Sequence, residues 1–332
     1  MKKILIDINH NQVNISNVIQ GIKLFNHSEK IYKITAVGRE EDMLTIKDLK
    51  DIETIYADDI YSGIDDLENS EVSLTKCFQL LSNETSQYDA FISSAPSDVI
   101  KAYAEKYLKR ISKYPTIIGE YPNAFTGRKT ALLDLGYDFA PSATSLIEMQ
   151  KLGQIYTKKV LYSQNFSFKL LTSARTIELE DEITRSADTY FKKIEGYKGL
   201  LKIEDIFSPD CKLVVGQSSI ISTLSQATHT MFDLYEKYID QAVSADFKTK
   251  IGSKLMNSTF RQINSSIDKK FTSGGTVLLG YNKNIVIADS STNSLGFKSS
   301  IVLAKTLVRC KMSEILENNE KNNDQVSKNN SK

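Results

Sequence analysis

The feature that most constrains the fold of this chain is an alternation of short, apolar, β-rich runs with amphipathic helical runs. Apolar runs at 3–9, 32–37, 52–57 and 90–94 are each followed by a segment with helical character, the first of which begins at Asn14. Strands that alternate with helices favour a parallel sheet covered on both faces, because each connecting helix packs back onto the sheet. We therefore predict an α/β fold of three layers, with a mostly parallel central sheet and helices on both faces.

The alternation continues, less regularly, toward the C-terminus. Further strands are predicted at 115–122, 131–135, 166–172, 200–203, 212–215, 277–279 and 285–287. From Ser218 to about Lys270 the chain has helical character and no proline, which predicts a protruding helical hairpin. Residues 314–332 carry few apolar side chains and are predicted to be a disordered polar tail. Residues 1–313 are predicted to form one large domain.

Composition excludes several classes of protein. The 332 residues include 42 basic and 41 acidic side chains, so no overall field attracts nucleic acid or an anionic membrane. No apolar run reaches about 18 residues, and Asp7 interrupts the N-terminal apolar run before a signal-peptide core could form. We expect a cytoplasmic protein with at most peripheral membrane contact. The three cysteines and three histidines are scattered, so we expect no metal site and no cofactor.

Polar clusters follow four of the predicted strands, at 7–11, 93–98, 134–138 and 288–293. The common nucleotide-binding motifs and the G-x-S-x-G elbow do not occur in the sequence. In a parallel sheet the carboxyl ends of the strands line the usual ligand site, so these clusters are the candidates for binding. Ser, Asp and Asn are also the ordinary N-caps of helices, so the alternative for each cluster is that it only caps the helix that follows.

The order of these pieces resembles the phosphate acyltransferase (PlsX) family over residues 2–311. Residues 274–282, Gly-Gly-Thr-Val-Leu-Leu-Gly-Tyr-Asn, are similar to the family's Gly-Gly-Ala-Pro-Leu-Leu-Gly-Val-Asn. Residues 133–138, Leu-Asp-Leu-Gly-Tyr-Asp, resemble Leu-Asp-Val-Gly-Ala-Asn, and 199–207 resemble a further family segment. The resemblance implies a fold like that of isocitrate and isopropylmalate dehydrogenases. It also implies transfer of a fatty acyl group from acyl carrier protein to inorganic phosphate in phospholipid synthesis.

Several polar signatures of the family are altered. The family's Lys-Ala-His-Gly-Ser-Ser is Ile-Ala-Asp-Ser-Ser-Thr at 287–292, so Asp289 takes the place of a histidine. The family's opening Asp-Ala-Met-Gly-Gly-Asp keeps only Asp7. By the resemblance, the catalytic groups would be Asp289, His10 and Arg175. The substrate-binding residues would be Asp7, Asn9, Ser94, Ser97, Asp134, Asp138, Ser290, Ser291 and Asn293.

Three functions remain open at this stage. The first is an active phosphate acyltransferase that binds acyl carrier protein and forms a homodimer through the hairpin. The second is a catalytically inactive or altered-specificity relative that acts as a binding or scaffold protein, which the missing glycines, lysine and histidine favour. The third is a NAD-dependent decarboxylating dehydrogenase, and it is weaker because no arginine cluster accompanies Asp134 and Asp138.

Overall fold

A computed structural model of the chain describes residues 2–8, 14–28, 32–47, 49–83, 85–122, 128–206, 209–244, 274–289 and 292–330. Four of the predicted site residues, Asn9, His10, Ser290 and Ser291, lie outside these ranges. The second half of the predicted hairpin, from residue 245 onward, also lies outside them.

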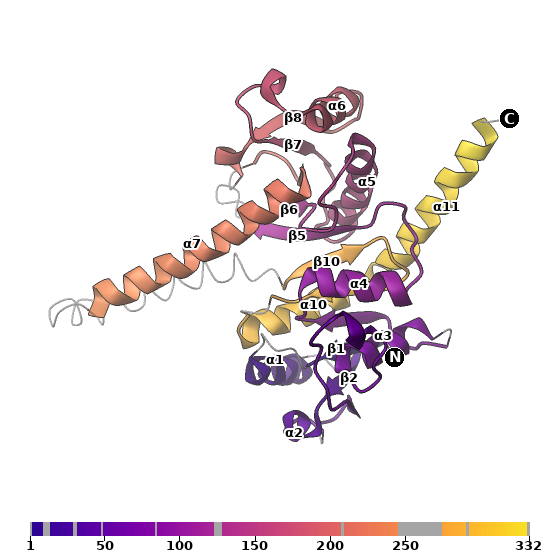
Figure 1. The fold of residues 1–332 in the computed structure, drawn as a ribbon, viewed down its shortest axis with the longest axis vertical. Helices are drawn as coiled ribbons and strands as arrows, with labels where there is room; N and C mark the ends of the chain where they lie inside the picture. Colours follow the sequence, from indigo (N-terminus) through magenta and orange to yellow (C-terminus); the bar gives the residue numbers. More distant parts are fainter. Residues whose placement is uncertain are drawn as a thin grey trace.

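The described residues form one eleven-stranded sheet with strand order β3-β2-β1-β4-β11-β10-β5-β6-β9-β7-β8 (Figure 1). The strands are β1 (Lys2–Asp7), β2 (Tyr32–Gly38), β3 (Ile52–Tyr56), β4 (Ala90–Ser93), β5 (Thr116–Pro122), β6 (Lys129–Leu133), β7 (Phe168–Thr172), β8 (Tyr197–Lys202), β9 (Leu213–Val215), β10 (Thr276–Leu279) and β11 (Asn284–Ile287). Each of these strands begins and ends within three residues of the bounds predicted from the sequence. The predicted α/β fold is confirmed.

The sheet consists of two groups of strands that run in opposite directions. Seven of the ten neighbouring strand pairs described are parallel. The antiparallel pairs lie together in the middle, where β10 pairs with β11 and β5, and β5 pairs with β6. Strands β1 to β5 and β11 therefore run one way, and β6 to β10 run the other. The carboxyl ends of the two groups lie at opposite ends of the sheet.

Helices cover both faces of the sheet. One face carries α1 (Ile15–Ser28), α5 (Ala143–Lys159), α6 (Glu182–Phe191) and α10 (Ser294–Arg309). The other face carries α3 (Ser73–Ser82), α4 (Ser97–Tyr107) and the start of α7 (Ser218–Ser244). Helix α2 is short and spans Glu40–Met43.

Strand alternation divides the core between the two faces. Ile4 and Ile6 pack on the side of α1 and α10, whereas Leu5 between them packs on the side of α3 and α4. Gly274 and Gly275 both have positive φ, of 88° and 95°. A Cβ atom on Gly275 would lie 2.2 Å from the carbonyl oxygen of Ile287. Glycine is therefore required where the chain enters β10 beside β11.

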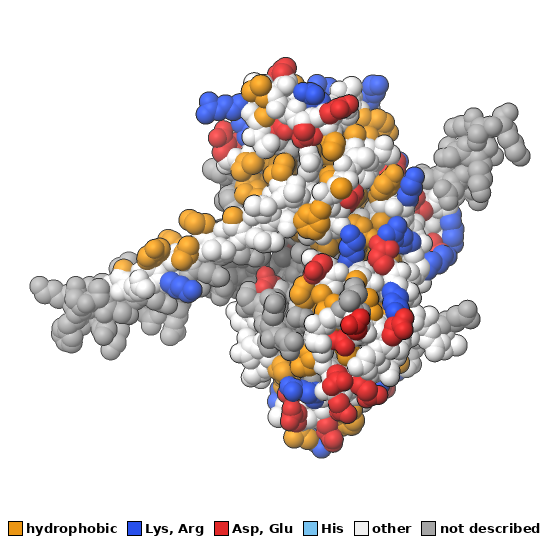
Figure 2. Space-filling view, viewed as in Figure 1, with side chains coloured by type: hydrophobic (Ala, Val, Ile, Leu, Met, Phe, Trp, Pro, Cys, Tyr) orange, Lys and Arg blue, Asp and Glu red, His pale blue; other side chains and the backbone are white. Residues whose placement is uncertain are grey.

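Two helices extend from the body of the molecule (Figure 1). The outer part of α7 carries hydrophobic side chains on its surface (Figure 2), and this helix supplies the first arm of the predicted hairpin. Helix α11 (Met312–Asn330) differs from the expected disordered tail. Its first turns are anchored because Met312 and Leu316, one turn apart, are both buried. No helix in the described ranges has the length and apolar character needed to cross a bilayer.

Candidate active site

Three predicted site residues lie at the same end of the sheet. Asp7 ends β1, Ser94 follows β4 directly, and Asp289 lies two residues beyond β11. These three strands are parallel neighbours in the sheet, and Ile287 at the end of β11 pairs with Ser93 at the end of β4. The expectation that polar strand ends meet at one edge thus holds for this group.

Asp7 anchors the turn that follows β4. Its side chain is buried, and its two carboxylate oxygens accept hydrogen bonds from Ser73 Oγ at 2.7 Å and Ser93 Oγ at 2.9 Å. Ser93 Oγ in turn accepts the backbone N–H of Ala95 at 3.1 Å. Asp7 therefore fixes the backbone on both sides of Ser94, the residue that leads into α4.

Asp134 lies at the other end of the sheet, because β6 runs opposite to β4 and β11. Its buried carboxylate accepts backbone N–H groups of Ile117 at 3.2 Å, Tyr137 at 3.0 Å and Asp138 at 2.9 Å. Burial raises the pKa of Asp134 to about 6, and these hydrogen bonds oppose the shift. The Asp138 carboxylate accepts the backbone N–H of Ala140. Both carboxylates thus hold the backbone that follows β6, and we call residues 135–139 the Gly136 loop.

The Gly136 loop reaches back across the sheet to meet two helices. Leu135 fills the space over Gly119 in β5, where a Cβ atom would lie 2.4 Å from Leu135 Cδ1. At Gly136 a Cβ atom would lie 3.9 Å from Ser97 Oγ, at the start of α4, and 3.7 Å from Ser222 Oγ on α7. We call this place the α4–α7 junction.

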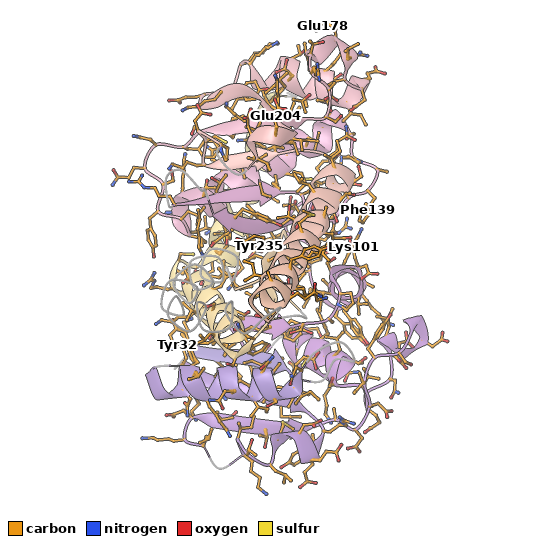
Figure 3. All side chains as sticks on the ribbon, turned by 90° about the vertical axis from the view of Figure 1, so that its left-hand side faces the viewer. Tyr32, Lys101, Phe139, Glu178, Glu204 and Tyr235 are labelled. Carbon is orange, nitrogen blue, oxygen red and sulfur yellow. The ribbon has the colours of Figure 1, made fainter. Side chains whose placement is uncertain are left out.

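The ring of Phe139 also belongs to the junction. Its Cζ atom lies 3.6 Å from the same Gly136 Cβ position, and 64% of the residue is exposed. Phe139 and Lys101 are labelled in Figure 3, where both lie to one side of α7. The junction therefore combines serine hydroxyls with one exposed aromatic ring.

One turn further along α7, Ser225 shares a hydrogen bond with the hydroxyl of Tyr121, on β5. Burial raises the pKa of Tyr121, and the charge of Asp289 raises it further. Tyr121 is therefore held in its protonated form, able to donate a hydrogen bond. The charge of Asp289 thus acts on Tyr121, which is hydrogen-bonded to α7 through Ser225.

Tyr121, Ser222 and Ser225 are not among the site residues predicted from the sequence. A signal for the serines exists, since Ser218, Ser222 and Ser225 recur at helical spacing and so share one face of α7. The sequence does not mark Tyr121 in this way, because a single tyrosine is common in an apolar strand and does not indicate a site.

The remaining predicted residues have other surroundings. Asn293 is the N-cap of α10 and accepts the backbone N–H of Gly296 at 2.9 Å. Arg175 is exposed in the loop after β7, which runs in the same direction as β6 and opposite to β4 and β11. The ammonium group of Lys129 lies 2.5 Å from the buried carboxylate of Glu120.

The described part of this site offers O–H and N–H donors, which suit an anionic or carbonyl oxygen. Its named components come from β5, the Gly136 loop and the starts of α4 and α7. His, Cys, Asp and Glu side chains of the described residues form no group that could hold a metal ion.

The fold of this chain is similar to the folds of two phosphotransacylases of known structure. It is similar to a branched-chain phosphotransacylase from Enterococcus faecalis V583, with a TM-score of 0.58 and 12% identity over 93% of this chain and 99% of that one. A phosphotransacetylase from Streptococcus pyogenes gives a TM-score of 0.54 and 13% identity over 92% of this chain and 94% of that one. At such identities the likeness concerns the fold.

The chain belongs to the family described as fatty acid synthesis protein, whose model matches residues 3–315. A phosphate acyltransferase of Campylobacter jejuni strain RM1221 is 25% identical over 259 residues, which cover 77% of either chain. A phosphate acyltransferase of Sulfurimonas denitrificans is 24% identical over 310 residues, which cover 89% of either chain. The resemblance found in the sequence is confirmed.

Proposed function

We propose that this protein transfers a fatty acyl group from acyl carrier protein to inorganic phosphate, yielding an acyl phosphate for phospholipid synthesis. Membership of the family and the phosphotransacylase-like fold support acyl transfer. The observation that carries the proposal is the α4–α7 junction, where the hydroxyls of Ser97 and Ser222 both lie within 4 Å of the position of a Cβ atom on Gly136. Tyr121 is hydrogen-bonded to Ser225, one turn farther along α7, and the charge of Asp289 acts on Tyr121.

The reaction places specific demands on such a site. An oxygen of phosphate attacks the thioester carbonyl carbon, a C–O bond forms, and the C–S bond then breaks to release the thiolate, which takes up a proton. Negative charge develops on the carbonyl oxygen, and donors fixed in advance stabilise it. Ser222 and the protonated Tyr121 are the donors that we assign to this oxygen and to the leaving sulfur.

The test is thioester release from long-chain acyl carrier protein by the purified protein, with and without phosphate. Acyl phosphate is trapped with hydroxylamine. Ser222→Ala should lower kcat/KM by about 10- to 100-fold, because that is the effect of losing one hydrogen bond to a charged group. Ser186→Ala, at an exposed position within α6, is the matched control and should leave the rate unchanged. Phosphate-independent release, or equal rates in the two variants, would contradict the proposal.

A second candidate is a catalytically inactive or altered-specificity relative that keeps the binding surface. The placement of two cations favours it, since Lys129 is paired with Glu120 and Arg175 is exposed after β7. The replacement of the family histidine by Asp289 also favours this second candidate. Binding of acyl carrier protein without any phosphate-dependent release would establish this alternative.

We also propose that the protein forms a homodimer through α7. Four of its side chains, Met231, Leu234, Tyr235 and Tyr238, are exposed and recur at helical spacing. Such a stripe on a helix extending from the body favours burial against a second copy. Light scattering should give the mass of a dimer, and Tyr238→Glu should give a monomer, whereas Lys237→Glu beside it should not. Co-sedimentation with liposomes by a monomeric protein would assign the stripe to a membrane surface instead.

A further inference from the structure

We infer that Lys101 is the residue whose charge binds phosphate in this protein, together with the hydroxyl of Ser97 on the same face of α4. The identity of the anion rests on the proposed function. The choice of Lys101 rests on its contacts with the Gly136 loop and on the neutral character of its partners. Phosphate is then held from α4, and the thioester from Ser222 and Tyr121.

Lys101 reaches the loop that the two serine hydroxyls also approach. Its Nζ atom donates to the backbone carbonyl of Tyr137 at 2.7 Å and lies 4.5 Å from the centre of the Tyr137 ring. Tyr137 follows Gly136, whose Cβ position lies 3.9 Å from Ser97 Oγ and 3.7 Å from Ser222 Oγ. Three polar side chains from α4 and α7 therefore converge on two consecutive loop residues, and Lys101 is labelled beside α7 in Figure 3.

The spacing along α4 supports this placement. Ser97 and Lys101 are four residues apart in the helix, so their side chains are neighbours on one face. Ser97, Lys101 and Ser222 each keep part of their surface exposed. The junction therefore lies at the surface of the protein, where a small anion can approach it from solution.

Tyr137, which holds the ammonium group, is itself fixed by the core. Its hydroxyl donates to Glu105 at 2.5 Å and shares a hydrogen bond with the hydroxyl of Tyr281 at 2.9 Å. Its backbone N–H donates to Asp134 at 3.0 Å, and only 5% of the residue is exposed. The carbonyl that orients Lys101 therefore has a set position. A cation that is already held in place loses less freedom when an anion binds.

The charge of Lys101 has no ion-pair partner in the part of the chain that the structure describes. Lys106, on the same helix, differs in this respect, since it pairs with Glu68 at 2.6 Å. An ammonium group has three N–H donors, and the carbonyl of Tyr137 takes one of them. The other two are available to a ligand, and lysine binds phosphate as a point charge.

Acidic side chains near Lys101 have partners of their own. Glu105, one turn farther along α4, forms an ion pair with Arg110. The carboxylate of Asp138 accepts a backbone N–H of its own segment. Burial raises the pKa of Tyr61, and the charge of Asp98 raises it further, so Asp98 lies near Tyr61. A phosphate group is therefore the partner that would balance the charge of Lys101.

The first experiment is calorimetric titration of the full chain with inorganic phosphate, without acyl donor. Lys101→Met removes the charge and keeps an unbranched side chain, so it should weaken phosphate binding by about 10- to 100-fold. Lys101→Arg keeps the charge and should retain most of the affinity. Lys106→Met is the matched control, because it removes another α4 lysine that lies over a tyrosine ring but is paired with Glu68. It should leave phosphate affinity unchanged.

A second measurement needs no variant. Lysines of the unaltered protein are acetylated chemically, and the rate at each position is followed by mass spectrometry. Phosphate at ten times its Kd should slow acetylation of Lys101 by about tenfold, because only the unliganded protein reacts there. Acetylation of Lys106 should not change. In the thioester assay, Lys101→Met should raise KM for phosphate and leave KM for the acyl carrier protein unchanged.

Four results would overturn the assignment: unchanged phosphate affinity in Lys101→Met, an equal loss in Lys106→Met, acetylation of Lys101 that phosphate does not slow, or no phosphate binding by the unaltered protein. The proposed function fails separately. Phosphate binding through Lys101 without any acyl transfer would refute that function and leave the assignment standing. Phosphate-dependent transfer that Lys101→Met does not alter would refute the assignment and leave the function standing.

Discussion

Replacement of Asp134 by asparagine should change the pH dependence of stability in a definite direction. The carboxylate is 1% exposed and accepts three backbone N–H groups, and its pKa is raised from 3.8 to about 6. A carboxyl group with a raised pKa in the folded state is protonated more readily there than in the unfolded chain. Its contribution to stability is therefore fully present below about pH 4 and is lost as the pH rises through about 6.

The magnitude follows from the size of the shift. About two pKa units correspond to about 3 kcal/mol of unfolding free energy, lost by the unaltered protein between about pH 4 and pH 7. Asparagine cannot ionise, so the unfolding free energy of the variant does not fall by this amount between pH 4 and pH 7. It loses one acceptor at every pH, which costs about 1–3 kcal/mol. The variant should therefore be clearly less stable than the unaltered protein at pH 4 and close to it at pH 7.

Urea unfolding of both proteins, at intervals from pH 4 to pH 7, measures this difference directly. Effects of other titrating groups cancel in the comparison. Asp138→Asn is the control, because it changes the neighbouring carboxylate, which accepts only the N–H of Ala140 among the described contacts. A destabilisation by Asp134→Asn that grows with pH, or that does not vary with pH, would refute the reasoning.

Three further changes test other parts of the structure. Tyr121→Phe removes the hydrogen bond to Ser225 and should speed hydrogen exchange in the first turns of α7, by an amount that corresponds to about 1 kcal/mol. Gly275→Ala should lower the unfolding free energy by more than about 2 kcal/mol in chemical denaturation, because φ is positive and a Cβ atom would meet a carbonyl of β11. Gly63→Ala, where a Cβ atom meets open space, should change it by less than about 0.5 kcal/mol. Leu316→Ala should cost about 2–3 kcal/mol and reduce the helical circular dichroism of α11.

Most strands and helices could be predicted from the sequence because their apolar periodicity is local. The direction of the strands could not, since β10 pairs with β5 and β11 through contacts distant in the chain. The four polar clusters would share one edge of the sheet only if all four strands ran in the same direction, and the reversal at β5 and β6 separates Asp134 from Asp7.

The candidate site shows the same limit. Ser94 and Ser97 could be identified as polar residues at a strand end, but the unpaired state of Ser94 Oγ is visible only in three dimensions. The meeting of Ser97 with Ser222 depends on the Gly136 loop, which crosses the sheet between elements far apart in sequence. Helix α11 was missed because the composition of residues 314–332 outweighed the two apolar anchors at its start.

The position of β11 has a consequence for how the protein is made. This strand comes late in the chain, yet it lies between β4 and β10, near the middle of the sheet. During synthesis, β4 therefore stays an open edge until almost the whole chain has left the ribosome. Pairing of such distant segments is slow, and an unpaired β4 edge is a template for association between incomplete chains. A chain that stops after α7 should aggregate, so the last strand to be synthesised completes a sheet that its earlier strands cannot close.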